Sequence, residues 1–277
     1  MSKFASIDIG SNTLLLLITD DASGTLMPIV DECDFGRLGQ GLAHSKRLHP
    51  DAVARSLEVV RRYRAIMDVH SLDGVACVGT QALREATNRD AFVGPAEEIL
   101  GCPIEIIAGE REAQLVATAV ITDFPKQCQG ELLCVDVGGA STEFIRIRGG
   151  ELVSVVSLPI GAVRLSETFL LSDPPTADET KNLYEAISAQ LATLDLPSSA
   201  QLVGSAGTAT SMASIALALA EYDPKQIHGY EMSRESVRSV AKNLLVSTVA
   251  DKMQLVGLAP KRADVIAGGV AIYDQVV

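Results

Sequence analysis

The sequence predicts an α/β protein made of two duplicated halves. Apolar strands alternate with amphipathic helices along all 277 residues, which is the pattern of the α/β class. A short pattern occurs twice, at residues 4–13 and 132–143: an apolar strand ends in Asp, and a turn of small residues follows. Asp8 and Asp136 stand nearly half the chain apart, so the repeated unit has the size of a domain rather than of a solenoid repeat.

The composition restricts the class of protein. A chain of 277 residues suits two domains, and a net charge of −12 argues against a general nucleic-acid-binding surface. The five cysteines lack Cys-x-x-Cys spacing, so we expect reduced, buried thiols rather than a disulfide framework or a zinc site. No targeting signal is visible, and the longest apolar runs fall far short of the roughly 20 residues that span a bilayer. We therefore expect a soluble, cytoplasmic protein.

Strands and helices alternate through the first half. Strands are predicted at residues 4–9, 14–18, 25–30, 74–78 and 103–107, and helices that begin near residues 50, 81 and 110. The first hairpin turns at residues 20–24, and Thr80 is placed to cap the second helix. In the third helix we expect Leu115 and Ala119 to face inward, with Val120 beside them.

The second half repeats the strand and hairpin after a predicted hinge at residues 123–130, which contains Pro125 and Gly130. Further strands are predicted near residues 152–158 and 202–205, and helices after residue 164, over 176–194, after residue 207, over 233–246 and over 261–273. The expected domains are residues 1–124 and 125–277, and the last helix is allowed to pack back on the first domain.

Three turns of small residues are candidate anion-binding sites. They lie at residues 10–12, 138–141 and 207–208, each directly after a predicted strand. With so little side-chain bulk, their backbone N–H groups can approach a phosphate closely, and the third turn also opens a helix. The alternative is structural, because glycine-rich turns also serve as ordinary hairpin and strand-to-helix connections.

Carboxylates accompany these turns. Asp8 and Asp136 end the two repeated strands, Glu143 follows the second turn, and Glu112 opens a helix. Phosphate beside carboxylates is typical of a divalent cation site. Two structural alternatives stay open: acids at a helix start are favoured by the helix dipole, and Arg84 near a strand end is equally compatible with a surface ion pair.

Several other chemistries are not indicated. The sequence has neither a Gly-x-x-x-x-Gly-Lys-Ser/Thr loop nor a Gly-x-Ser-x-Gly elbow. None of the four histidines has a metal-ligand spacing. A phosphoryl transfer that relies on positioning, a cation and a carboxylate base therefore fits best.

Seven motifs, in the same order, resemble those of the exopolyphosphatase/guanosine pentaphosphate phosphohydrolase family, which has the actin–sugar kinase–Hsp70 fold. They are IDIGSNT at 7–13, RLGQGL at 37–42, TQALREA at 80–86, EREA at 110–113, DVGGASTE at 136–143, SLPIGAVR at 157–164 and GT at 207–208. The resemblance covers nearly the whole chain. It implies two actin-like (ribonuclease H-like) domains with a cleft between them.

The resemblance also implies an activity, a cofactor and roles for residues. The activity is Mg²⁺-assisted release of terminal phosphate from polyphosphate, with guanosine pentaphosphate as a further substrate. Glu112 would be the general base, Asp136 and Glu143 would arrange Mg²⁺ and water, and Asp8 would contribute to the metal site from the other side. The choice of Glu112 over Glu110 rests on the resemblance. The residues expected to bind substrate are Gly10, Ser11, Asn12, Arg84, Gly138, Gly139, Ala140, Ser141, Gly207 and Thr208.

Two features depart from the family pattern. Ala140 stands where the family usually has a third glycine, and we expect its methyl group to block positive φ and to crowd a phosphate. The sequence ends at Val277, without the additional C-terminal helical domains of longer members. We therefore expect short polyphosphate chains, or a guanosine pentaphosphate-like nucleotide, as substrate.

Two alternative functions stay open at this stage. One is a sensor that binds polyphosphate or guanosine tetraphosphate with little turnover, and the other is an ATP-using kinase or ATPase of the same superfamily. The kinase alternative is disfavoured, because no sugar-binding signature is evident. The expected partner is polyphosphate or a phosphorylated guanosine nucleotide, with no nucleic acid and no membrane. A homodimer is left open.

Overall fold

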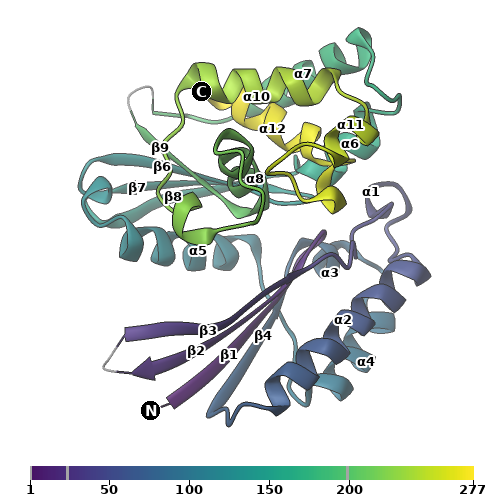
Figure 1. Ribbon diagram of the computed structural model, residues 1–277, viewed down its shortest axis with the longest axis vertical. Coiled ribbons are helices and arrows are strands. Elements are labelled where there is room, and N and C mark those ends of the chain that lie inside the picture. The colour runs from purple at the N-terminus through teal and green to yellow at the C-terminus, as the bar shows by residue number, and fades with distance from the viewer. Residues whose placement is uncertain (1, 23–24, 198–199) are drawn as a thin grey trace. The chain divides into compact units, whose positions relative to one another are not determined.

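The computed structural model describes residues 2–22, 25–197 and 200–277. Of the turn predicted at residues 20–24, Ser23 and Gly24 lie outside the described residues, and residues 20–22 continue the second strand. The chain packs as two compact units, Met1–Gly109 (unit 1) and Glu110–Val277 (unit 2). Each unit contains one β-sheet and its own helices (Figure 1). None of the described helices is long and apolar enough to cross a membrane. The predicted α/β class is confirmed, and the cleft expected between the two domains stays a prediction.

The sheet of unit 1 has the strand order β3-β2-β1-β4-β5. Its strands are β1 (Ser2–Ile9), β2 (Leu14–Ala22), β3 (Thr25–Asp34), β4 (Gly74–Gly79) and β5 (Glu105–Ile106). Its helices are α1 (Leu42–Ser45), α2 (Pro50–Asp68), α3 (Gln81–Glu85) and α4 (Asp90–Leu100). Strands β1, β2 and β3 are antiparallel, β4 is parallel to β1, and α2 packs against α4 and β2 (Figure 1).

The alternation of side chains along β1 shows which face of this sheet the helices cover. Ala5, Ile7 and Ile9 are buried in one core with apolar residues of α2 and α4, whereas Phe4 is exposed. Because successive side chains of a strand point to opposite faces, Asp8 belongs to the same face as Phe4. The carboxylate at the end of β1 therefore lies on the sheet face opposite α2 and α4.

The sheet of unit 2 has the strand order β8-β7-β6-β9. Its strands are β6 (Glu131–Val137), β7 (Thr142–Arg148), β8 (Glu151–Leu158) and β9 (Gln201–Ser205). Its α-helices are α5 (Gly109–Asp123), α6 (Ala162–Phe169), α7 (Ala177–Leu191), α8 (Ala206–Ala216), α9 (Pro224–Ile227), α10 (Arg234–Val246), α11 (Val249–Met253) and α12 (Ile266–Val276), with 3-10 turns η1 (Gln127–Gln129) and η2 (Pro260–Arg262).

Helices cover both faces of this second sheet. On one face, α5 packs its small buried residues against alternate residues of β6, among them Leu132 and Cys134. On the other face, Leu133, Val135 and Val137 pack in a larger core with α6, α7, α8, α10 and α12 (Figure 1). Burial on both faces explains why β6 is nearly continuously apolar in the sequence.

The two sheets confirm the duplication. The order β3-β2-β1-β4 of unit 1 corresponds to β8-β7-β6-β9 of unit 2, with the same antiparallel hairpins and the same parallel crossover. The register agrees too, because Asp8 lies opposite Leu15 on β2 and Asp136 lies opposite Glu143 on β7. The units differ at one edge. Unit 1 adds β5 beside β4, and the described part of unit 2 has no strand beyond β9.

The predicted orientation of α5 is wrong for Leu115 and Ala119 and is confirmed for Val120. The buried residues are Ala113, Ala117 and Val120, whereas Leu115 is 42% exposed and Ala119 is also exposed. Small alanines at helical spacing let α5 lie close to the sheet, and Leu115 does not share their face. Helix α5 packs with unit 2, so the compact units divide at the start of this helix, whereas the predicted boundary at 124/125 lies just after its end.

Two other elements are shorter than predicted. The strand expected over residues 103–107 is reduced to β5, because only Glu105 and Ile106 pair with β4. The last helix begins at Ile266 rather than near residue 261, because residues 260–262 form the turn η2. Helix α12 packs against α6, α7, α8 and α10 within unit 2.

Candidate active site

The first two small-residue turns have the same backbone geometry. In unit 1, the N–H of Gly10 donates to the carbonyl oxygen of Thr13 at 3.0 Å. In unit 2, the N–H of Gly138 donates to the carbonyl oxygen of Ser141, also at 3.0 Å. The two hydrogen bonds have the same offset along the chain as Asp8 and Asp136, so the repeat seen in the sequence is a repeat of backbone conformation.

In unit 1, the loop after β3 supports the first turn from behind. The N–H of Gly39 donates to the carbonyl oxygen of Ser11 at 2.8 Å, and that of Arg37 donates to Asn12 at 3.0 Å. The side chains of Ser11 and Asn12 are buried, and the Oδ1 atom of Asn12 has no hydrogen-bond partner among the described residues. Such a buried acceptor requires a donor, and a cation or an ordered water would satisfy it.

In unit 2, the segment after β8 supports the second turn in the same way. The N–H of Ala162 donates to the carbonyl oxygen of Gly138 at 2.9 Å, and that of Val163 donates to Gly139 at 2.8 Å. An ideal Cβ placed on Gly161 would lie 2.6 Å from the backbone nitrogen of Ala140, so this contact requires glycine. The motifs at residues 37–42 and 157–164 therefore have the same structural role. Each donates backbone hydrogen bonds to one turn, and each contains one arginine, Arg37 or Arg164.

The expectation that Ala140 needs a positive φ is wrong. The non-glycine residues with positive φ among those described are Arg37, Lys46, Ala206 and Ala218, so Ala140 does not need the left-handed conformation that its methyl group would disfavour. The close contact that requires glycine is at Gly161 of the supporting segment. The expected crowding of a phosphate by the Ala140 methyl group stays a prediction.

Unit 2 brings three predicted carboxylates together. Asp136 and Glu143 pair across β6 and β7 on the sheet face that α5 covers, and the first turn of α5 carries Glu112. Glu143 is only 2% exposed, and its Oε1 accepts a hydrogen bond from the Ser157 hydroxyl at 2.7 Å. Glu112 is half-buried and acts electrostatically on Glu143, whereas the neighbouring Glu110 is exposed.

These surroundings raise the pKa of Glu143 to about 7. Burial is the largest cause, and the nearby negative charges of Glu112 and then Asp136 add to it, while hydrogen bonds from the hydroxyls of Ser157 and Ser141 oppose it. A hard divalent cation prefers oxygen ligands such as these three carboxylates, and its positive charge would relieve their mutual repulsion. No ready-made group of three or more metal-ligating side chains is found among the described residues.

The third turn joins β9 to α8 and has a strained backbone. Ala206 has a φ of 62°, which is unfavourable for a residue with a Cβ atom. The Thr208 side chain is buried against α12, where its Oγ1 would lie 2.6 Å from a Cβ on Gly269. An anion at this helix start would be bound by backbone N–H groups rather than by the buried Thr208 side chain.

One charged residue at this turn was missed by the sequence analysis. The guanidinium of Arg262 lies directly over Gly207, since an ideal Cβ on that glycine would fall 2.2 Å from both Nη1 and Nη2. Arg262 lies far from Gly207 along the chain and belongs to η2, in a stretch that the sequence analysis assigned to a helix. The only available signal was its position within a Lys-Arg pair, which does not specify a contact.

Arg84 is held in place in unit 1 by groups of its own unit. Its Nη1 donates to the carbonyl oxygen of Ile107 at 2.8 Å, and its Nη2 donates to the Gln81 Oε1 at 2.6 Å. Thr80 occupies the N-cap position of α3, but it makes no side-chain cap hydrogen bond, and its hydroxyl lies 3.4 Å from the carbonyl oxygen of Ile9. This contact ties the helix that carries Arg84 to the end of β1, next to Asp8.

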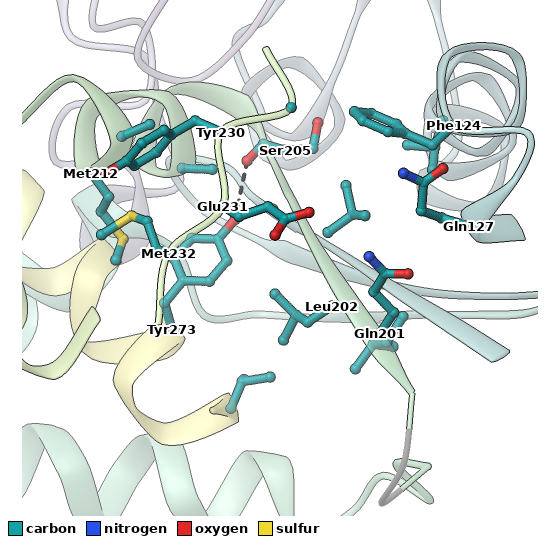
Figure 2. Close-up of a pocket in the computed structure, with 18 of the residues that line it drawn as sticks. Phe124, Gln127, Gln201, Leu202, Ser205, Met212, Tyr230, Glu231, Met232 and Tyr273 are labelled. Carbon is teal, nitrogen blue, oxygen red and sulfur yellow. Dashed lines mark hydrogen bonds between the residues drawn. The ribbon is translucent and has the colours of Figure 1, made fainter. Parts of the chain in front are cut away.

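A cavity of about 820 Å³ in unit 2 contains none of the predicted site residues. It runs along β9, with Gln201, Leu202 and Ser205 on one side and Tyr230 and Met232 among the residues around it (Figure 2). In unit 1, β5 occupies the corresponding edge of the sheet. The cavity therefore lies at the sheet edge where the described part of unit 2 lacks a counterpart of β5. The carboxylates Glu112, Asp136 and Glu143 lie outside it, near the second turn.

The repeated strand–turn–strand units with matched turns define the actin-like class of α/β proteins. Residues 17–277 match the model of the Ppx/GppA phosphatase family. Exopolyphosphatase 2 of Mycobacterium tuberculosis is 32% identical over 288 residues, which cover 99% of this chain and 90% of the relative. The chain belongs to the Ppx/GppA phosphatase family, so the resemblance seen in the sequence and the expected class of phosphoanhydride hydrolase are confirmed.

Solved structures agree with this assignment. The Aquifex aeolicus member of the Ppx/GppA family is 30% identical, with a TM-score of 0.81 over 99% of this chain and 89% of that one. An exopolyphosphatase from Cytophaga hutchinsonii is 26% identical, with a TM-score of 0.87 over 100% of this chain and 90% of that one. The expected fold is confirmed, and the roles assigned to individual residues stay predictions.

Proposed function

We propose that this protein releases the terminal orthophosphate of short inorganic polyphosphate chains, with Glu112 as the general base. The observation that supports this most is the group of three carboxylates, Glu112, Asp136 and Glu143, at the end of the strands that hold the second turn. The relative from M. tuberculosis is named an exopolyphosphatase, which agrees with the substrate.

The proposed reaction is an in-line attack of water on the terminal phosphorus. Glu112 takes a proton from the water while the water oxygen forms a bond to phosphorus. The bridging P–O bond breaks at the same time, and the shortened chain leaves as the anion. The backbone N–H groups of the turns at residues 10–12, 138–141 and 207–208 would hold the phosphate oxygens. Arg37, Arg84, Arg164 and Arg262 each lie in or beside a segment that contacts one of these turns or the strand end before it, and we expect them to neutralise charge on the polyphosphate chain.

We expect Mg²⁺ to be the cofactor, because carboxylate and amide oxygens are the ligands that it prefers. The pKa of Glu143 is raised by burial and by the neighbouring charges of Glu112 and Asp136. A cation would compensate this carboxylate, and a cation would likewise satisfy the buried acceptor Oδ1 of Asn12. Asp136 and Glu143 would hold the ion, with Asp8 contributing from unit 1. Bound there, Mg²⁺ would neutralise charge on the phosphate that is transferred.

Guanosine pentaphosphate is the second substrate to test, because it carries the same terminal anhydride. A sensor with little turnover stays the alternative to test, although Ala140 does not have the positive φ that would strain its backbone.

The experiment is phosphate release from tripolyphosphate and from guanosine pentaphosphate, with Mg²⁺ and with excess chelator. We expect Mg²⁺-dependent release, and we expect Glu112→Gln to reduce it by about 10²–10⁴-fold while binding and thermal stability stay near those of the wild type. Glu110→Gln is the matched control, because Glu110 is an exposed carboxylate in the same helical turn. Equal losses in the two variants would contradict the assignment of Glu112 as the base.

A further inference from the structure

A buried tyrosine of unit 2 links the strands that lead into the second and third turns. Tyr273 of α12 is only 3% exposed. Its hydroxyl donates to the carbonyl oxygen of Val135 on β6 at 2.7 Å and to that of Ser205 on β9 at 3.2 Å. Figure 2 shows the hydrogen bond to Ser205. Val135 directly precedes Asp136, and Ser205 directly precedes the strained Ala206, so one side chain contacts the backbone beside both site elements.

Small residues leave room for the Tyr273 ring against β9. An ideal Cβ on Gly204 would lie 3.1 Å from the tyrosine hydroxyl oxygen, 3.3 Å from its Cε1 atom and 2.9 Å from the Cβ of Ala209. A side chain at position 204 would therefore push the ring away from the strand. The backbone ladder between β6 and β9 ends at the pair formed by Asp136 and Ser205. The tyrosine thus adds a contact between these strands at the end where their pairing stops.

The hydrogen bond to Ser205 acts directly on the strained residue of the third turn. Ala206 has a φ of 62°, and such a conformation of a residue with a Cβ persists only where its surroundings hold it. The carbonyl oxygen of Ser205 belongs to the planar peptide group that joins Ser205 to Ala206. A change in φ at Ala206 turns this peptide group relative to the rest of the turn, so the hydrogen bond on its oxygen opposes the relaxation.

We propose that Tyr273 is a positioning residue whose hydroxyl holds Ala206 at positive φ and thereby fixes the backbone N–H groups of the third turn for phosphate binding. This inference rests on the proposed function, in which that turn binds phosphate. A turn that is ordered before binding holds an anion better than one that must be ordered on binding, because folding has already met the entropic cost. Tyr273 acts through this backbone and is assigned no contact with substrate.

A substitution at Ala206 distinguishes this role from a purely structural one. Glycine adopts positive φ without strain, so Ala206→Gly removes the need for a contact that holds the turn. The positioning role therefore predicts that the effect of Tyr273 on substrate affinity disappears in the Ala206→Gly background, because residues that act through one contact are not additive. A structural role would change thermal stability alone, and a role exerted through Val135 would be the same in both backgrounds.

The experiment measures the Kd of tripolyphosphate by calorimetry, together with thermal stability, for the wild type, Tyr273→Phe, Ala206→Gly and the double variant. Tyr273→Phe keeps the ring and removes both hydrogen bonds. We expect it to raise Kd by roughly fivefold, the scale of one hydrogen bond, and by less than about twofold in the Ala206→Gly background. Ala206→Gly should raise the melting temperature of the wild type, and it should raise that of Tyr273→Phe less, because there the strain has already relaxed.

Tyr184→Phe is the matched control. The hydroxyl of Tyr184 on α7 donates to Oδ2 of Asp274, which is the residue next to Tyr273 on α12. The control therefore removes a tyrosine hydrogen bond from the same helix without changing a contact to β6 or β9. We expect it to lower thermal stability and to leave the Kd of tripolyphosphate within about twofold of the wild type.

The possible outcomes separate this inference from the proposed function. An unchanged Kd in Tyr273→Phe, the same rise in both backgrounds, or an equal rise in Tyr184→Phe overturns the positioning role. Calorimetry reports binding without turnover, so a wild type that binds tripolyphosphate and does not hydrolyse it contradicts the activity alone. A wild type that does not bind tripolyphosphate overturns the proposed function and the phosphate part of this inference. The four melting temperatures then decide by themselves whether Tyr273 holds Ala206, and equal gains from Ala206→Gly with and without the hydroxyl show that it does not.

Discussion

Gly161→Ala should damage the second turn without touching any residue that is proposed to react. Gly161 contacts the Gly139–Ala140 peptide so closely that a Cβ would lie 2.6 Å from two of its backbone atoms and 2.7 Å from a third. These atoms are backbone, so no side chain can rotate away to make room. The added methyl group must therefore displace either the turn or the segment that supports it.

The size of the displacement follows from these distances. Ordinary van der Waals contact of a Cβ begins at 3.4 Å, so a contact at 2.6 Å requires a shift of about 0.8 Å. Overpacking of this kind costs about 1–3 kcal/mol of stability. A displacement close to 1 Å in groups that position substrate costs about 10²-fold in rate. We therefore expect phosphate release to fall by about 10²-fold while the protein stays folded.

The assay is phosphate release from tripolyphosphate, with thermal unfolding followed by circular dichroism on the same samples. Gly94→Ala is the matched control, because a Cβ on this glycine of α4 would meet nothing within 4 Å. The same substitution there should preserve turnover and should raise stability, since alanine is favoured over glycine by up to about 1 kcal/mol inside a helix. If Gly161→Ala turned over as fast as Gly94→Ala, the assignment of this turn to phosphate positioning would be refuted.

Three further predictions concern the carboxylates and the substrate. Asp136→Asn should remove Mg²⁺-dependent release more completely than Asp8→Asn, because Asp136 has Glu143 opposite and Asp8 has Leu15; equal residual rates would count against this asymmetry. The pKa of Glu143 is raised in the folded protein to about 7, so its contribution to stability is present below pH 4.5 and is lost as the pH rises through about 7. Thermal melts without Mg²⁺ at pH 5 and pH 8 should show this loss in the wild type, and the loss should be smaller in Glu143→Gln. With 23 Lys and Arg and a net charge of −12, the chain lacks a long cationic track, so long polyphosphate should shorten distributively, as a ladder that shifts together; intact long chains beside fully degraded ones would show processivity.

The sequence was sufficient for the parts of the site that depend on local pattern. The spacing of Asp8 and Asp136 predicted the repeat, and the matched hydrogen bonds of Gly10 and Gly138 show that the backbone follows it. The pairing of Asp136 with Glu143 could also be predicted, because a short turn between two strands fixes their register.

The contacts between distant segments could not be predicted in this way. Nothing local specifies that Arg262 covers Gly207, since that contact depends on how a loop crosses α8. The expected restriction by a methyl group concerned Ala140, within the turn, whereas the contact too close for a Cβ is at Gly161, on the segment that supports the turn. The inward face of α5 was misjudged because Leu115 is more hydrophobic than the alanines that fit against the sheet.

The matched hairpins of the two units hold side chains of very different exposure at the same register position. Leu15 is 39% exposed, and Glu143, its counterpart in unit 2, is 2% exposed. The strands and turns are the same, and the difference is the layer of helix that covers one sheet face in unit 2. A glutamate introduced at position 15 would therefore lack the burial that is the largest cause of the raised pKa of Glu143. In this architecture the hairpin fixes the position of a carboxyl group, and the helices that cover the sheet face set its burial and thereby its pKa.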